Sequence, residues 1–317
     1  MPHALHRATL ALHTPLGTPL AGDTLFGQLC WALREAAGEA ELTRRLEGYT
    51  QGQPWLIASD GFPAGYLPRP TLPQHFAAPA DDPTQRKAAR KRRWIPVQNT
   101  GATLATLLAS AVDDGVAYGS APRHAVQAHN TLDRLTGTTG EGVFAPYSVA
   151  QTFHAAGQHI DVYLVLDTDR IGTDAAAGLL AALGSAGFGR DAGVGLGKFT
   201  LVSLEPAAFA GPAGANACWT LAPCAPQGQG FAGAKSYWRV LTRFGRHGNA
   251  LALAGQPFKT PVLLAASGAV LTPGGRFTVQ PFVGQGLGGA GQLSKAEPAT
   301  VQQGYAPVAT IALEAAP

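Results

Sequence analysis

Alternating apolar and polar positions predict the strands of the first two thirds of the chain. The strongest alternation covers residues 158–167, where Ile160, Val162, Leu164 and Leu166 share one side and Asp161 and Tyr163 share the other. A period of two is typical of a β-strand that contacts a core. Weaker signals of the same kind predict further strands at 8–13, 56–58, 66–67 and 198–205.

Helical spacing of apolar residues predicts two helices between these strands. Asp23 is expected to cap the first, whose apolar stripe consists of Phe26, Leu29, Cys30 and Leu33. The second is Ala-rich, begins at Thr173 or Asp174 and ends near Gly184. The order β-α-β-β-α-β predicts an α+β fold of the ferredoxin-like or RRM-like kind, with a long insertion at about 70–150.

The last third of the chain has a different character. The Pro- and Gly-rich tract 205–216 is typical of a linker, and strand-like runs follow at 237–242, 261–266 and 307–313. We therefore expect two domains, a ferredoxin-like domain over residues 1–205 and a smaller β-rich domain over residues 206–317.

Composition excludes several classes of protein. The 317 residues are 46% hydrophobic and include 40 Gly and 24 Pro, which excludes a disordered, collagenous or fibrous chain and predicts a loop-rich globular one. The chain has three cysteines, Cys30, Cys218 and Cys224, and they lack the spacing of a zinc or thioredoxin-like site. No apolar run reaches membrane-spanning length, and no secretory signal is evident. We expect a cytoplasmic protein without metal, cofactor or membrane partner.

A basic run lies inside the insertion. Residues 86–93 contain six cations, and Trp94 follows them. Such a run neutralises phosphates, and an aromatic side chain can stack on a base, so Lys91, Arg92, Arg93 and Trp94 are candidate RNA contacts. The alternative is a solvated helix face balanced by Asp81 and Asp82.

A glycine cluster occupies residues 187–198. Glycines allow backbone N–H groups to approach a phosphate, and Arg190 and Lys198 add charge. A P-loop would need Gly at position 192 and Ser or Thr at position 199, where the chain has Ala192 and Phe199, and it would lead from strand to helix. ATP and NAD are therefore disfavoured, and a plain connector is the alternative. The candidate RNA contacts are Gly189, Arg190, Asp191, Gly193, Gly195, Gly197 and Lys198.

A third polar segment, 130–142, combines an amide, hydroxyls and glycines. With Arg123 it predicts contacts to phosphate, sugar and base edges, made by Asn130, Arg134 and Thr136. An ordered surface loop is the alternative. His124 and His129 suggest a second chemistry, general-base cleavage of RNA without a metal.

Four segments together resemble subunit four of the Csm complex, a RAMP-family subunit of the type III-A CRISPR effector. They are residues 23–33, 130–142, the glycine-rich 187–199 and 304–306 before the last strand. The resemblance implies RRM-like domains and a non-catalytic role: binding the 5′ handle of CRISPR RNA through the candidate residues above. The implied protein partners are the large palm-domain subunit and the adjacent backbone RAMP subunit. A metal-independent CRISPR-repeat endoribonuclease of the RAMP superfamily, and an assembly subunit that contacts only protein, are the alternatives.

Overall fold

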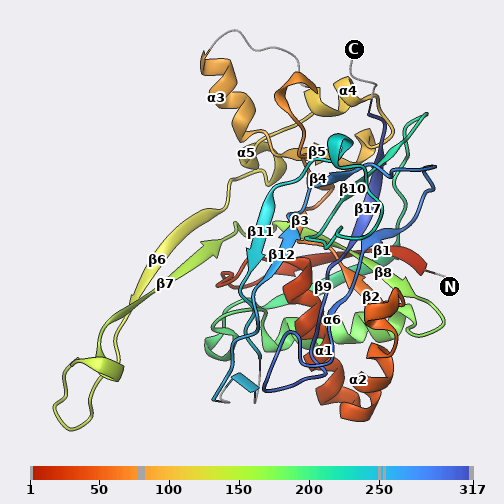
Figure 1. Ribbon diagram of the computed structural model, residues 1–317. Coiled ribbons are helices and arrows are strands. Elements are labelled where there is room, and N and C mark those ends of the chain that lie inside the picture. The colour runs from red at the N-terminus through yellow and green to blue at the C-terminus, as the bar shows by residue number, and fades with distance from the viewer. Residues whose placement is uncertain (1–2, 77–82, 249–250, 253–254, 314–317) are drawn as a thin grey trace.

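A computed structural model describes residues 3–76, 83–248, 251–252 and 255–313 of the chain (Figure 1). Its central antiparallel sheet has the strand order β2–β8–β1–β9, and β3 pairs with β8 beside β2. These strands are β1 (His3–Leu12), β2 (Leu56–Ala58), β3 (Phe62–Pro63), β8 (His159–Asp167) and β9 (Phe199–Pro206). The predicted strands at 8–13, 56–58, 158–167 and 198–205 are confirmed, with boundaries that differ by at most five residues.

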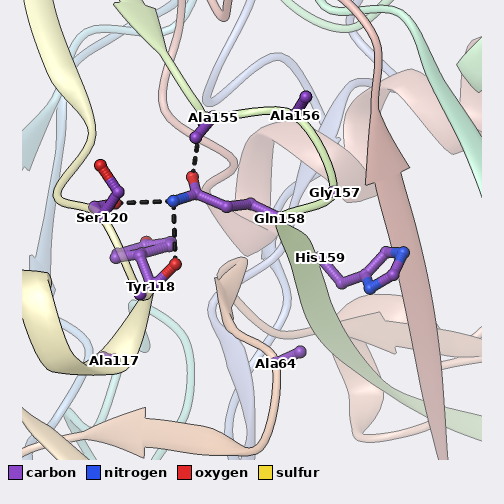
Figure 2. Close-up of a pocket in the computed structure, with 10 residues that line it drawn as sticks. Ala64, Ala117, Tyr118, Ser120, Ala155, Ala156, Gly157, Gln158 and His159 are labelled. Carbon is purple, nitrogen blue, oxygen red and sulfur yellow. Dashed lines mark hydrogen bonds between the residues drawn. The ribbon is translucent and has the colours of Figure 1, made fainter.

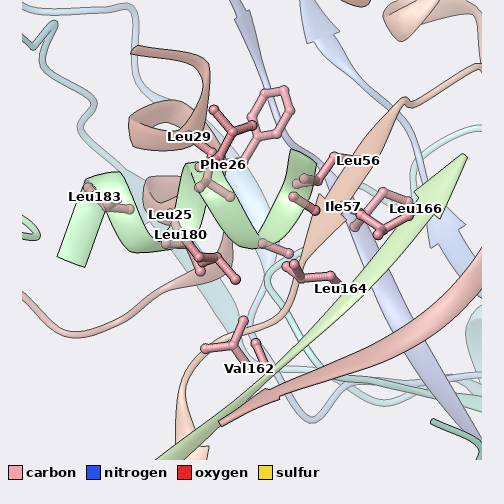
Figure 3. Close-up of a cluster of buried hydrophobic side chains, with 14 of the residues drawn as sticks. Leu25, Phe26, Leu29, Leu56, Ile57, Val162, Leu164, Leu166, Leu180 and Leu183 are labelled. Atoms are coloured by element: carbon pink, nitrogen blue, oxygen red, sulfur yellow. The ribbon is translucent and has the colours of Figure 1, made fainter. Parts of the chain in front are cut away.

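Helices α1 (Gly22–Ala37) and α6 (Thr173–Ala186) pack on one face of this sheet (Figure 3). Phe26 and Leu29 of α1 meet Leu180 and Leu183 of α6 above the buried side chains of β2 and β8. The short helix α2 (Glu39–Leu46) follows α1. Helix α6 continues two residues beyond Gly184. Gly184 is a packing residue against β9, since a Cβ there would be 2.3 Å from the Phe199 carbonyl oxygen.

The predicted helix cap at Asp23 is wrong. Ala21 is the cap residue, and the carboxylate of Asp60 accepts the N–H of Gly22 at 2.8 Å. Asp23 lies in the first turn of α1, where its carboxylate pairs with Arg243 from the C-terminal third. A distant segment therefore supplies the cap, which frees Asp23 for another contact.

The other face of the central sheet is covered by the C-terminal third. There, β10 (Ala217–Thr220), β13 (Val270–Leu271), β14 (Phe282–Gly284) and β17 (Tyr305–Ile311) form a sheet of order β13–β10–β17–β14. Tyr163 of β8 is buried together with Trp219 of β10. The Tyr305 hydroxyl donates to the Tyr49 carbonyl at 2.5 Å. The sheet of the C-terminal third is thus packed closely on the N-terminal sheet.

Residues 66–153 form several smaller elements. Strand β4 (Tyr66–Pro68) pairs with β5 (Trp94–Pro96), so the predicted strand 66–67 exists but its partner is β5. Helices α3 (Pro83–Lys91), α4 (Leu104–Ala109) and α5 (Asp114–Ala117) surround this pair. The hairpin of β6 (Arg123–His129) and β7 (Tyr147–Phe153) extends far from the body (Figure 1).

Two further strand pairs complete the fold, β11 (Val240–Arg243) with β12 (Val262–Ala265) and β15 (Leu287–Gly288) with β16 (Val301–Gln302). Short 3-10 helices are η1 (Tyr49–Gln51), η2 (Gln74–Phe76), η3 (Val97–Asn99), η4 (Gly142–Phe144), η5 (Ala192–Val194) and η6 (Gly233–Lys235). Within the described ranges, no helix has the length and apolar character to span a membrane.

Candidate RNA-binding site

The glycine cluster and the base of the β6–β7 hairpin lie against each other. Leu16, in the loop after β1, exchanges two backbone hydrogen bonds with Thr152 of β7, at 3.0 and 2.9 Å. The Arg190 guanidinium donates to the Ala150 carbonyl of the same strand at 2.6 Å. The structure therefore brings one predicted contact, Arg190, to the hairpin on which several others lie.

The glycine loop, residues 187–198, folds tightly on itself and on its neighbours. The Phe188 N–H donates to the Gly197 carbonyl at 2.9 Å, and Phe188 itself is buried. At Gly197, φ is +70° and a Cβ would lie 2.0 Å from the Phe188 oxygen, so only glycine fits. The N–H groups of Gly189 and Arg190 donate to the side chains of Gln28 and Thr18, at 3.2 and 3.0 Å.

These contacts limit which amides of the loop can bind a ligand. Nine of the twelve backbone N–H groups already donate within the chain, those of Gly187, Phe188, Gly189, Arg190, Val194, Gly195, Leu196, Gly197 and Lys198. At most three remain, those of Asp191, Ala192 and Gly193. Two exposed cations flank them, because the side chains of Arg190 and Lys198 are solvent-accessible.

Cationic and imidazole side chains surround the base of the hairpin. The Arg123 guanidinium lies 4.5 Å from the ring centroid of Phe153, its partner across the hairpin. His124 Nδ1 lies 3.0 Å from Thr152 Oγ1. Burial lowers the pKa of His154, and the charge of His124 lowers it further, so His154 is neutral at pH 7.

The end of the basic run lies nearby, held by Asp114 at the start of α5. Arg93 pairs with the Asp114 carboxylate, and Trp94 Nε1 donates to it at 2.7 Å. Burial raises the pKa of Asp114, but the hydrogen bonds from Arg93 and Trp94 outweigh it, and the pKa is lowered. The Trp94 ring also packs edge-on against Tyr118, with centroids 6.0 Å apart. Trp94 thus has a structural role here.

The other members of the basic run are placed differently. Lys91 and Arg92 are exposed at the end of α3. The predicted balancing residues Asp81 and Asp82, and the side chain of Arg86, lie outside the described residues.

Asn130, Arg134 and Thr136 lie at the far tip of the hairpin (Figure 1). All three are exposed on a turn that Asp133 organises: its backbone N–H donates to the Thr138 carbonyl at 3.0 Å, and its carboxylate accepts the Leu135 N–H at 2.9 Å. The structure therefore does not bring the tip residues together with the glycine loop.

The two candidate histidines point to opposite faces of β6, since they are five residues apart in a strand. The ring of His129 stacks on Tyr147, with centroids 5.2 Å apart and an interplanar angle of 12°. His124 faces Thr152 instead. The two rings cannot act together on one phosphate.

A cavity of about 350 Å³ lies at the base of the hairpin, between the segment that precedes β6 and the segment that follows β7 (Figure 2). Gln158 spans it: its amide nitrogen donates to the carbonyls of Tyr118 and Ser120, at 2.9 and 2.6 Å. Its amide oxygen accepts the Ala155 N–H at 2.9 Å. Gln158 thereby joins the segment that enters β6 to the segment that leaves β7.

Sequence reasoning did not identify the positioning residues Thr18, Gln28, Asp114 and Gln158. Each makes its contact with a segment distant in the sequence, so no local pattern marks it. Among the described residues, no three His, Cys, Asp or Glu side chains are grouped to hold a metal ion. Burial raises the pKa values of Cys218 and Cys224 to about 12, so both thiols are protonated at neutral pH.

The chain shares its mixed fold of helices and strands, over almost its whole length, with solved structures of CRISPR effector subunits. One is the crystal structure of the Csm1–Csm4 cassette in complex with pppApA, at 15% identity and a TM-score of 0.61, covering 99% of this chain and 100% of that chain. The same cassette with cA4 gives 14% identity and a TM-score of 0.58, covering 98% and 100%.

The Csm3–Csm4 subcomplex of the type III-A CRISPR-Cas interference complex gives 10% identity and a TM-score of 0.54, covering 93% and 98% of the two chains. No protein-family model and no curated protein matches the sequence. The comparisons therefore confirm the resemblance to a subunit-four-like RAMP protein at the level of the fold.

Proposed function

We propose that this chain is a non-catalytic subunit of a type III-A effector complex that binds the 5′ handle of CRISPR RNA. The observation that carries the proposal is the contact between the glycine loop and the hairpin, made through Arg190 and Ala150. This contact joins the loop that carries the free N–H groups of residues 191–193 to the strand β7, and this supports the proposal. The protein partners in the proposal are the large palm-domain subunit and the adjacent backbone RAMP subunit.

The topology supports a ferredoxin-like, RRM-like assignment for the first part of the chain. Strands β1, β2, β8 and β9 and helices α1 and α6 follow the order β-α-β-β-α-β, and the sheet order is β2–β8–β1–β9. In this assignment residues 70–150 are an insertion between the second and third strands. We propose domain limits of 1–205 and 206–317.

Phosphates are bound, in this proposal, at the base of the hairpin. The N–H groups of Asp191 to Gly193 donate to one phosphate, and Arg190, Lys198 and Arg123 neutralise its neighbours. The tip residues Asn130, Arg134 and Thr136 contact a separate part of the strand, because the hairpin holds them at a distance. RNA is bound and no bond is broken.

No observation favours the ribonuclease alternative. Cleavage without a metal needs a base and an acid on either side of one phosphate. His124 and His129 lie on opposite faces of β6, and His129 is stacked on Tyr147. The geometry supports a binding role for this surface.

Filter binding of handle RNA across a salt series tests the proposal. Arg190→Ala should weaken binding by about 1 to 3 kcal/mol and reduce the salt slope, because one charge-assisted phosphate contact is lost. Arg190→Lys keeps the charge and should retain the slope. Arg276→Ala removes an exposed arginine of the C-terminal third as the matched control and should bind normally. Wild-type affinity and slope in Arg190→Ala would remove the glycine loop from the site.

A further inference from the structure

The C-terminal third has an extreme charge distribution. Between Glu205 and Glu297 the sequence contains seven Lys and Arg residues and no Asp or Glu. One of these cations, Arg243, is neutralised by Asp23. The other cations therefore give this part of the protein a net positive charge.

One face of the β11–β12 pair within this region is apolar and open to solvent. Val240 lies in β11 and Leu263 in β12, while Trp238 and Phe244 flank β11 and Phe258 precedes β12. We call these five residues the apolar strip. Val240, Phe244, Phe258 and Leu263 are 70%, 74%, 71% and 59% exposed. The inward side of the pair is apolar too, since Leu264, the partner of Leu241, is 2% exposed, so the outward apolar residues are additional to those that face the core. A cluster of this kind marks an interaction surface.

The inner face of the same pair is fixed to the body of the protein. Arg243 points inward to the buried carboxylate of Asp23, at 2.6 and 2.9 Å. The hydroxyl of Ser294 lies 2.7 Å from the buried His247 ring. The outward direction of the apolar strip is therefore set by contacts on its other side, and the strip is held in place without a partner.

A cavity lies at one end of the apolar strip. It measures about 340 Å³ and is lined by Trp238, Val240 and Leu263 together with Phe231 and glycines of the loop that precedes β11. A hollow of this size accepts one large apolar side chain. Exposed cations flank the strip: Arg239 lies within it in sequence, and the Arg246 guanidinium lies 5.7 Å from the Phe258 ring centroid.

Among the described residues, no strand pairs with the outer edge of β11. Its one strand partner in these ranges is β12, and the Arg239 carbonyl accepts the Ala266 N–H on that side. Because pairing alternates along an antiparallel strand, the backbone groups of Val240 and Thr242 point away from β12. An open edge of this kind pairs with extended protein chain.

We propose that the apolar strip is the docking surface for the large subunit of the effector complex, which would present an apolar segment flanked by acidic residues. This inference rests on the proposed function. Single-stranded RNA would contact the cations and the aromatic rings, but its binding does not require two aliphatic side chains, an apolar hollow or a free strand edge. A protein partner accounts for all of these features together with the charge.

The test uses the full chain and the large palm-domain subunit of the proposed complex, mixed after nuclease treatment and measured by calorimetry. The variant Val240→Ser/Phe244→Ser removes two exposed side chains that support no core, and it should weaken binding at least tenfold. The matched control is Val279→Ser, since Val279 is 71% exposed outside the strip, and it should bind as the wild type does. Equal thermal unfolding midpoints of the three proteins establish that they are folded.

Handle RNA binding by the same proteins separates the outcomes. Loss of subunit binding with retained RNA binding supports the apolar strip as the docking surface. Wild-type subunit affinity in the double variant overturns it, and loss of RNA binding alone assigns the strip to RNA and overturns it too. If the wild-type chain itself does not bind the large subunit, the proposed function loses this partner, and the docking surface is overturned with it.

Discussion

Replacing Arg243 by methionine breaks a buried ion pair that joins β11 in the C-terminal third to the first turn of α1. The Asp23 side chain is 2% exposed and that of Arg243 is 27% exposed. Arg243 donates from Nε at 2.6 Å and from Nη2 at 2.9 Å, and Gln302 adds a weaker hydrogen bond at 3.3 Å. The variant therefore leaves a buried carboxylate with the weak Gln302 hydrogen bond and the coulombic attraction of Lys259 as its remaining support.

The expected loss follows from this geometry. Removing one member of a buried ion pair costs about 3 to 5 kcal/mol, because the remaining charge stays desolvated. Asp23 keeps Gln302 and lies in the first turn of α1, where the helix dipole offsets up to about 1 kcal/mol. We therefore expect Arg243→Met to lower the free energy of unfolding by about 3 kcal/mol.

Urea unfolding followed by tryptophan fluorescence measures this loss, since Trp55 and Trp219 are fully buried. The control is Arg7→Met, which breaks the exposed Arg7–Glu205 pair and should cost less than about 1 kcal/mol. Asp23→Leu/Arg243→Met removes both charges and should recover most of the stability. If Arg243→Met costs no more than Arg7→Met, the ion pair does not hold the C-terminal third in place.

Two further substitutions test the glycine loop and the cap of α1. Gly197→Ala should destabilise the protein by more than about 1 kcal/mol in urea unfolding, because its Cβ would overlap the Phe188 oxygen at positive φ. The control Gly193→Ala has open space around its Cβ and should change stability by less than about 0.5 kcal/mol. Equal losses in the two variants would refute the close approach. Burial raises the pKa of Asp60 to about 7, so the native state holds a proton that the unfolded chain releases, and stability should fall by up to about 4 kcal/mol as the pH rises from 4 to 8. Asp60→Asn keeps an acceptor for the Gly22 N–H and should abolish that fall; an unchanged pH profile would contradict the assignment to Asp60.

Strong periodicity explains why the main elements were predictable. Strand β8 and helices α1 and α6 have long apolar patterns, because each presents one continuous face to the same core. The strands β10, β13, β14, β15 and β16 were missed. They have two to four residues, and Ala217, Cys218, Trp219 and Thr220 of β10 are all buried, so no alternation marks them.

The candidate site was predictable in its composition but not in its internal contacts. Glycine spacing located the loop. Glycine is needed at Gly197 because the backbone packs against Phe188 there, and the sequence alone does not distinguish this packing role from phosphate binding. The predicted stacking of Trp94 on a base stays a prediction, and the sequence did not reveal that its indole N–H donates to Asp114 and that its ring contacts Tyr118. Both roles depend on residues distant in sequence or on other elements, and local patterns carry no information about them.

Helix α1 supports both proposed surfaces. Its polar residues Asp23 and Gln28 each contact one of them. Asp23 in its first turn holds Arg243 beneath the apolar strip, and Gln28, five residues later, accepts the Gly189 N–H of the glycine loop. Leu25 and Leu29 are fully buried and fix the helix to the core. Because a rigid helix carries both contacts, the RNA path and the docking strip keep a constant separation. A change at Asp23 should therefore act on subunit binding and a change at Gln28 on RNA binding, while only a change at Leu25 or Leu29 should impair both.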